Sequence, residues 1–325
     1  MKHVTILAMT DSNMASVDNP RRGFLAANQF LRQDSKTSVF EVQIAGIERE
    51  VPLNNGLFTI HADTTIDSIR KTDLIIIPAL EGDITEALSR SRNFIPWIIN
   101  QYKNGAEVAS LCVGAFILAS TGLLKGKSCS THWRAAHEFR KMFPEVELIT
   151  EKVITDENSL YTSGGAFSSA NLILYLIEKF AGREPAIHCA KIFQIDMERQ
   201  TQSPFIIFQG QKDHNDDRIK QAQEFIESNF QEKISVDQLT SLLALSRRNL
   251  ERRFKKATTN TVIEYIQRVK IEAAKKFFES SAKNINEVMY DVGYSDNKAF
   301  RNVFRKITGL SPVEYRSKYN KNAYF

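Results

Sequence analysis

The chain has 325 residues and holds 43 Lys and Arg against 38 Asp and Glu, for a net charge of +5. This length favours two domains, each able to bury its own core. The cysteines, Cys112, Cys129 and Cys189, are too few and too scattered for a disulfide framework, which favours a reducing compartment. Neither a signal-peptide pattern nor an apolar run of about 18 residues is present. We therefore expect a cytoplasmic protein with no membrane partner.

Apolar runs alternate with helical patterns through the first half of the chain. Residues 4–9, 39–45 and 73–78 predict strands, and the last of these should be fully buried. Residues 20–31 predict a helix with Pro20 in its first turn, and residues 94–103 predict another. This alternation indicates an α/β domain with a doubly wound, mostly parallel sheet.

The densest apolar stretch of this half surrounds Cys112. A strand should end at Leu111, Cys112 should occupy a sharp bend, and Gly114 should let the next helix begin close behind it. Such a bend presents a side chain at the C-terminal edge of the sheet, where open α/β folds bind ligands. The free N–H groups there would favour a thiolate and would bind a carboxylate or phosphate.

His132 follows twenty residues after Cys112. A cysteine and a histidine together fit a nucleophile with its base. The alternative is a small buried cysteine in a crowded turn and a histidine satisfied by backbone groups. His188 and Cys189 are adjacent but lack a third ligand at metal spacing, so we expect no metal and no cofactor.

The segment SLCVGAFILASTGLLKGKSCSTHW resembles the DJ-1/PfpI superfamily, of the class I glutamine amidotransferase-like folds, and the resemblance covers roughly residues 3–180. It implies a flavodoxin-like fold, matches Cys112 to the reactive cysteine, and matches His132 to the histidine partner of the enzymatic members. The segment YTSGGAF opens a later helix in the same fold. The expected ligand-binding residues are Cys112, Val113, Gly114, His132, Gly164 and Gly165.

Two departures from that superfamily argue against catalysis. Enzymatic members carry a glutamate after the first strand that hydrogen-bonds the cysteine, and here Ala15 takes its place. They often have a glycine whose N–H helps form an oxyanion hole, where this chain has Ala79 and Leu80. We therefore expect a binding pocket. A hydrolase, amidase or glyoxalase-like enzyme using Cys112 and His132, and a Cys112 redox sensor, are the alternatives.

Residues 284–315 predict two short helices joined by a tight turn. Gly293 should end the first, and Ser295 or Asp296 should cap the second. The second helix alternates an apolar face with a face of Arg, Lys and Asn, as in a helix-turn-helix that contacts phosphates and base edges.

The same pattern occurs fifty residues earlier, at residues 236–257, where Ser246 is the expected cap. The apolar positions repeat in phase: Leu250, Phe254 and Thr258 fall on Phe300, Phe304 and Thr308. We interpret this as two copies of one unit. A helix over residues 261–279 should hold them apart, so that each faces a major-groove segment about 34 Å from the other.

Residues 218–320 resemble the DNA-binding domain of the AraC/XylS family, with DVGYSDNKAFRNVFRKITGLSPVEYR matching its signature. Residues 211–325 also hold 22 Lys and Arg against 15 Asp and Glu, as phosphate binding requires. Glu251 could accept a hydrogen bond from a cytosine amine or hold Arg252 and Lys255 in place. Arg253 should pack against the domain or contact a DNA phosphate. By resemblance the DNA-reading residues are Arg247, Arg248, Glu251, Arg252, Asn297, Lys298, Arg301 and Asn302.

Between these domains, residues 183–210 predict one helix and then a strand-like tail at Pro204, and residues 211–217 predict a polar linker. The predicted organisation is a sensor domain at 1–182, a connection at 183–217, and an all-α domain with two helix-turn-helix units at 218–325. The combination resembles the GlxA-type transcription regulators. It implies promoter DNA, an unknown small-molecule effector, RNA polymerase and a second copy of the chain as partners.

Overall fold

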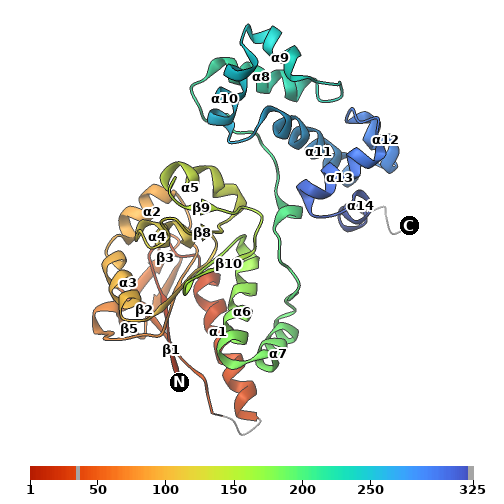
Figure 1. Ribbon diagram of the computed structural model, residues 1–325. Coiled ribbons are helices and arrows are strands. Elements are labelled where there is room, and N and C mark those ends of the chain that lie inside the picture. Colours follow the sequence, from red (N-terminus) through yellow and green to blue (C-terminus); the bar gives the residue numbers. More distant parts are fainter. Residues whose placement is uncertain (34–36, 321–325) are drawn as a thin grey trace. The chain divides into compact units, whose positions relative to one another are not determined.

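The computed structural model describes residues 1–33 and 37–320 and divides the chain into two compact units, Met1–Gln202 and Ser203–Phe325 (Figure 1). The predicted connection at 183–217 is shared between them. Its helix packs in the first unit, and the residues after Gln202 pack in the second.

The first unit is built on a seven-stranded sheet in the order β10-β11-β7-β6-β1-β2-β5. Its strands are parallel except for β10, which runs antiparallel to β11. The doubly wound, mostly parallel sheet is confirmed. The strands are β1 Lys2–Leu7, β2 Phe40–Gly46, β5 Thr64–Thr65, β6 Leu74–Ile77, β7 Glu107–Ser110, β10 Ile154–Glu157 and β11 Leu160–Ser163. Two small sheets pair β3 Glu50–Leu53 with β4 Phe58–His61, and β8 Ser128–Cys129 with β9 Glu147–Leu148.

Helices cover both faces of this sheet, because its central strands are apolar on both sides. In β6, Leu74 and Ile76 pack into one core cluster, and Ile75 and Ile77 pack into the other. One face is covered by α1 Met14–Gln33, α6 Ser169–Ala181 and α7 Arg183–Phe193. The other is covered by α2 Ile84–Ser91, α3 Phe94–Lys103, α4 Ala115–Ser120 and α5 Ala136–Met142.

Two local predictions in this part are wrong. The helix expected from Pro20 begins at Met14, where the side chain and carbonyl of Asn13 bond Ser16, so Pro20 lies inside the helix. The strand-like tail at Pro204 is a short 3-10 turn, Ser203–Phe205. The nearest extended pairing is an isolated bridge between Thr201 and Lys152, three residues before Pro204.

The second unit contains seven helices within residues 203–320: α8 Asp217–Ser228, α9 Val236–Leu243, α10 Arg247–Thr258, α11 Val262–Ser280, α12 Ile285–Asp291, α13 Asn297–Thr308 and α14 Pro312–Tyr319. The long helix α11 belongs to both of its cores. Its first half packs Val262 and Tyr265 into one cluster, and its second half packs Ile271 and Phe278 into the other. The long helix predicted over residues 261–279 is therefore confirmed, and it packs against both helix-turn-helix units.

The fifty-residue repeat extends to the helix caps. Ser246 caps α10 and Asp296 caps α13. The helices that follow begin with capping boxes in the same register, Thr261 with Glu264 and Ser311 with Glu314. Over the described residues, no helix combines the length and apolar character needed to cross a bilayer.

Candidate nucleic-acid interface and ligand site

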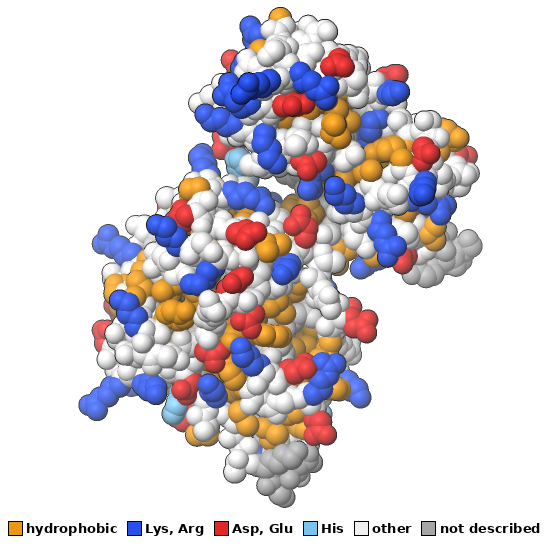
Figure 2. Space-filling view, viewed as in Figure 1, with side chains coloured by type: hydrophobic (Ala, Val, Ile, Leu, Met, Phe, Trp, Pro, Cys, Tyr) orange, Lys and Arg blue, Asp and Glu red, His pale blue; other side chains and the backbone are white. Residues whose placement is uncertain are grey.

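Helices α10 and α13 each bury one face and expose the other. Leu250 and Phe254 in α10, and Phe300 and Phe304 in α13, are fully buried at the same helical spacing. The opposite faces carry the basic residues, and Figure 2 shows Lys and Arg side chains gathered over the part of the second unit that holds α8 to α10. Each exposed face is one that a major groove could accept.

The predicted DNA-reading residues of α13 and Arg248 of α10 are exposed and unpaired in the described structure, except for Asn297. Arg248, Lys298, Arg301 and Asn302 are exposed and form no hydrogen bond or ion pair with any other described residue. Asn297 is half-buried, and its amide donates to Asn286 Oδ1 at 2.7 Å. That bond ties the start of α13 back to α12, so Asn297 positions the helix as well as facing outward.

Glu251 bonds a residue that the sequence did not indicate. Its carboxylate accepts from Arg247 Nε at 3.0 Å, whereas Arg252 donates to Asn249 Oδ1 at 3.1 Å. The expectation that Glu251 orders Arg252 and Lys255 is therefore not what the structure shows. An i, i+4 pair in solvent is weak, so either partner can leave it for a base.

Arg253 faces inward and anchors the entry to this unit. Its guanidinium donates to both oxygens of Asp216, at 2.8 and 2.5 Å, and this pairing lowers the pKa of Asp216. Asp216 also caps α8 by accepting from Ile219 N. The predicted polar linker thus ends on the first recognition helix.

The stretch before Asp216 is fixed to α11 by a buried ion pair. Lys275 and Glu272 lie 2.8 Å apart, Lys275 Nζ donates to the Ile206 carbonyl, and Glu272 accepts from the Phe208 N–H. Because both charges are largely buried, each needs these backbone partners as well as the other charge.

Lys270 joins the two helix-turn-helix units, and sequence reasoning missed it. This lysine is 5% exposed, and its Nζ donates to the carbonyls of Phe230 and Glu232 after α8, and of Val292 and Gly293 in the second turn. A Cβ on Gly293 would lie 2.3 Å from the Gln231 carbonyl oxygen, so the turn and the loop are in direct contact. The sequence could have indicated that Lys270 is buried, because it lies four residues after Ile266 and four before Ala274, on the apolar face of α11.

In the first unit, Cys112 occupies the predicted bend, with φ at +54°. Gly114 is required behind it, because a Cβ there would lie 2.4 Å from the Pro78 carbonyl oxygen. The Cys112 side chain is buried, and burial raises the pKa of its thiol to about 11, despite the opposing hydrogen bond from Val113. The expectation of a favoured thiolate is wrong, because desolvation outweighs the backbone N–H groups.

His132 lies in a segment that contacts the bend but does not pair with the thiol. Thr131 Oγ1 donates to the Cys112 carbonyl at 2.9 Å, so the two segments do meet. The Nδ1 atom of His132 accepts from Arg134 N at 3.1 Å and caps the 3-10 turn Trp133–Ala135. Burial and the Arg134 charge lower the pKa of His132. No hydrogen bond between Cys112 and His132 occurs in the described structure.

Two backbone N–H groups near this bend that could stabilise an oxyanion already bond serine hydroxyls. The Cys112 N–H donates to Ser163 Oγ at 3.3 Å, and the Ala79 N–H donates to Ser16 Oγ at 3.0 Å. Ala15, at the position of the family glutamate, is exposed at the start of α1. An oxyanion would have to displace serine hydroxyls from both donors.

Gly164 and Gly165 lie beside Gln202, a residue that sequence reasoning missed. Gln202 is 1% exposed, its Oε1 accepts from the Gly165 N–H at 3.1 Å, and its Nε2 donates to the Thr131 carbonyl at 2.9 Å. A Cβ on Gly164 would lie 2.3 Å from Gln202 Nε2. The glycine pair therefore makes room for an amide supplied by the chain itself. In residues 1–33 and 37–320, no group of three His, Cys, Asp or Glu is placed to hold a metal ion.

Comparison with known proteins matches both units. A DJ-1/PfpI family model matches residues 23–179, and a helix-turn-helix domain model matches residues 239–318. The HTH-type transcriptional regulator GbdR of Pseudomonas aeruginosa is 26% identical over 269 residues, covering 82% of this chain and 72% of that protein. The regulator ArgR of the same organism is 25% identical over 216 residues, covering 66% and 65%. A crystal structure of an AraC family transcriptional regulator from Pseudomonas putida has a TM-score of 0.50 at 18% identity, covering 59% of this chain and all of that one.

The paired basic helices and these matches define a helix-turn-helix DNA-binding protein with an α/β domain ahead of its DNA-binding part. The chain is an AraC-type transcription regulator that carries a DJ-1/PfpI domain.

Proposed function

We propose that the DJ-1/PfpI domain of this regulator binds a small-molecule effector at the Cys112 bend and catalyses no reaction. The observation that carries this is the bonding of the bend: the Cys112 and Ala79 N–H groups bond serine hydroxyls, and the Val113 N–H bonds the Cys112 thiol. The thiol is neutral at pH 7, because its pKa is about 11. A neutral thiol also argues against a hydrolase and against a redox sensor, since both chemistries begin from the thiolate.

The effector contacts in this proposal are Cys112, Val113, Gly114 and His132, with Gly164 and Gly165 behind them. An effector carrying an amide or carboxylate would replace Gln202 at the Gly165 N–H. Gln202 is the last residue of the first unit and Ser203 is the first residue of the second. Displacement of Gln202 would therefore pull on the chain that enters the DNA-binding unit. Such coupling requires that the effector bind more tightly when Gln202 is released.

The functional partners follow from this role. We propose that the regulator binds promoter DNA as a dimer formed through its first unit, contacts RNA polymerase there, and acts in the cytoplasm. Two copies would present four recognition helices, which suits repeated or inverted half-sites. The three cysteines are free and buried in the structure, as suits a reducing compartment.

The proposal is tested by fluorescence anisotropy on the purified full chain and labelled DNA from upstream of its own gene. Random duplex serves as competitor at two salt concentrations. Non-specific binding rests on phosphate contacts, so the competitor displaces it, whereas sequence-specific binding survives. Binding no tighter than to random DNA would contradict regulation at this site. Gln202→Ala should change specific affinity or its response to added small molecules, with Gln200→Ala, an exposed neighbour, as the matched control. Turnover of a p-nitrophenyl ester or of methylglyoxal that disappears in Cys112→Ser would support the alternative hypothesis of a Cys112-dependent enzyme.

A further inference from the structure

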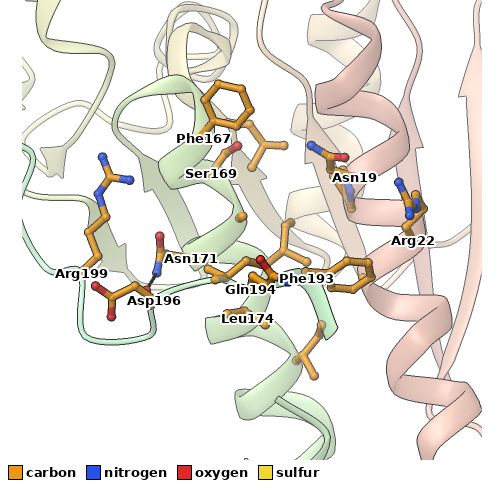
Figure 3. Close-up of a pocket in the computed structure, with 17 residues that line it drawn as sticks. Asn19, Arg22, Phe167, Ser169, Asn171, Leu174, Phe193, Gln194, Asp196 and Arg199 are labelled. Atoms are coloured by element: carbon orange, nitrogen blue, oxygen red, sulfur yellow. Dashed lines mark hydrogen bonds between the residues drawn. The ribbon is translucent and has the colours of Figure 1, made fainter. Parts of the chain in front are cut away.

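A cavity of the first unit is lined by residues of α1 and α6 and by Leu111, but not by Cys112. It has a volume of about 430 Å³ and lies between α1, the first half of α6 and the segment that follows α7 (Figure 3). Its apolar wall is formed by Leu111, Ile173, Leu174, Ile177 and Phe193. Figure 2 shows apolar side chains gathered on the face of the first unit along α1 and α6.

The wall opposite α1 is held in place by its own hydrogen bonds. Asn171, which is 6% exposed, donates from Nδ2 to the Asp196 carbonyl at 2.5 Å. The Asp196 carboxylate in turn accepts from the Glu198 N–H at 2.9 Å. The segment after α7 is therefore fixed over the cavity before any ligand arrives, which lowers the cost of binding.

The α1 wall supplies polar groups that have no hydrogen-bond partner in the described structure. Arg22 and Asn19 lie on α1 three residues apart and line the cavity. The Arg22 guanidinium lies 5.7 Å from the centre of the Phe193 ring and forms no ion pair with a described residue. A guanidinium over an aromatic ring, beside an amide, is suited to a planar anion.

We propose that this cavity is a binding site for a small organic anion with an apolar body, separate from the effector site at Cys112. The apolar body would contact Ile173, Leu174 and Phe193, and the anionic group would pair with Arg22. The volume suits a ligand of one or two rings, within the usual range for small-molecule sites. The far wall carries both Asp196 and Arg199 (Figure 3), so their charges oppose each other there and the anionic group is expected at the Arg22 end.

The test uses naphthalene-1-sulfonate, which has an apolar two-ring body and one sulfonate, titrated into the full chain by isothermal titration calorimetry. We expect saturable binding that weakens about tenfold in Arg22→Ala, as for loss of one charge-assisted bond. Ala170→Phe, which fills the cavity, should also abolish the signal. The matched control is Arg21→Ala, because Arg21 is an exposed neighbour that lines no part of the cavity and lies 3.9 Å from Asp18.

Three outcomes would overturn the proposal. The first is an affinity for the probe that is unchanged in both Arg22→Ala and Ala170→Phe. The second is a loss of affinity in Arg21→Ala equal to that in Arg22→Ala. The third is a loss of probe binding accompanied by dissociation of a dimer, measured by light scattering. The last would show that a second copy covers the cavity. If Ala170→Phe fails to fold by circular dichroism, Arg22→Ala decides alone, since the Arg22 side chain is exposed. None of these readouts depends on DNA binding, so they stand apart from the proposed function.

Discussion

Replacing Lys270 by methionine should loosen the contact between the two helix-turn-helix units. The substitution keeps the length of the side chain but removes the donor shared by four carbonyls, at 2.7, 2.9, 2.9 and 3.3 Å. A buried acceptor left without its donor costs about 1–3 kcal/mol. Removing the buried charge offsets part of that cost, so we expect a net loss of about 2–4 kcal/mol in the free energy of unfolding of the second unit.

The pH dependence of the unfolding free energy distinguishes the contribution of Lys270 from those of other residues. Burial lowers the pKa of Lys270 from 10.5 to about 8. Between these values the unfolded chain binds the proton and the folded chain does not, so stability rises with pH in this window. From pH 8 to pH 10 the gain is about 2 kcal/mol for the natural chain. In Lys270→Met this gain should be absent.

Chemical unfolding followed by two signals measures this change. Both tryptophans, Trp97 and Trp133, lie in the first unit, so their fluorescence reports on that unit, while circular dichroism at the helical band also follows the second. Lys276→Met, an exposed neighbour on α11, is the matched control. The reasoning is refuted if Lys270→Met keeps the rise between pH 8 and pH 10, or if the fluorescence transition moves as far as the helical one.

Three further predictions concern the two sites. Arg301→Ala should lose about 1–3 kcal/mol of binding free energy at a specific DNA site and much less on random DNA. Fluorescence anisotropy measures both affinities, with Arg305→Ala for comparison. An equal loss on both DNAs would make Arg301 a phosphate contact. Alkylation of Cys112 by iodoacetamide should be slow at pH 7 and accelerate toward pH 11, because the pKa of its thiol is about 11. Fast labelling at pH 7, measured by mass spectrometry, would contradict a protonated thiol. Gly164→Ala should displace Gln202 from the Gly165 N–H, since the added Cβ would lie 2.3 Å from the Gln202 amide nitrogen. Hydrogen exchange at the Gly165 N–H should then rise, and unchanged exchange would contradict this displacement.

Local signals in the sequence determined most of the secondary structure and the class of protein. The caps at Ser246 and Asp296 bond backbone N–H groups three residues further along, and the Gly293 turn depends on the positive φ of that glycine. The helix 94–103 follows from the spacing of its own apolar residues. The in-phase repeat of apolar positions likewise needed no tertiary information, because helical spacing alone assigns each residue to a face. The basic outer faces of α10 and α13 followed from that assignment.

Only the tertiary structure decided which distant groups meet. Lys270 bonds carbonyls 38 and 40 residues away, and Gln202 bonds a carbonyl 71 residues away, and neither separation leaves a periodic trace in the chain. The protonation of Cys112 was decided in the same way. The sequence showed the bend and its N–H groups, which favour a thiolate, but the burial that raises its pKa is the sum of packing from several elements. Desolvation depends on everything around a group, so it is fixed only when the chain has folded.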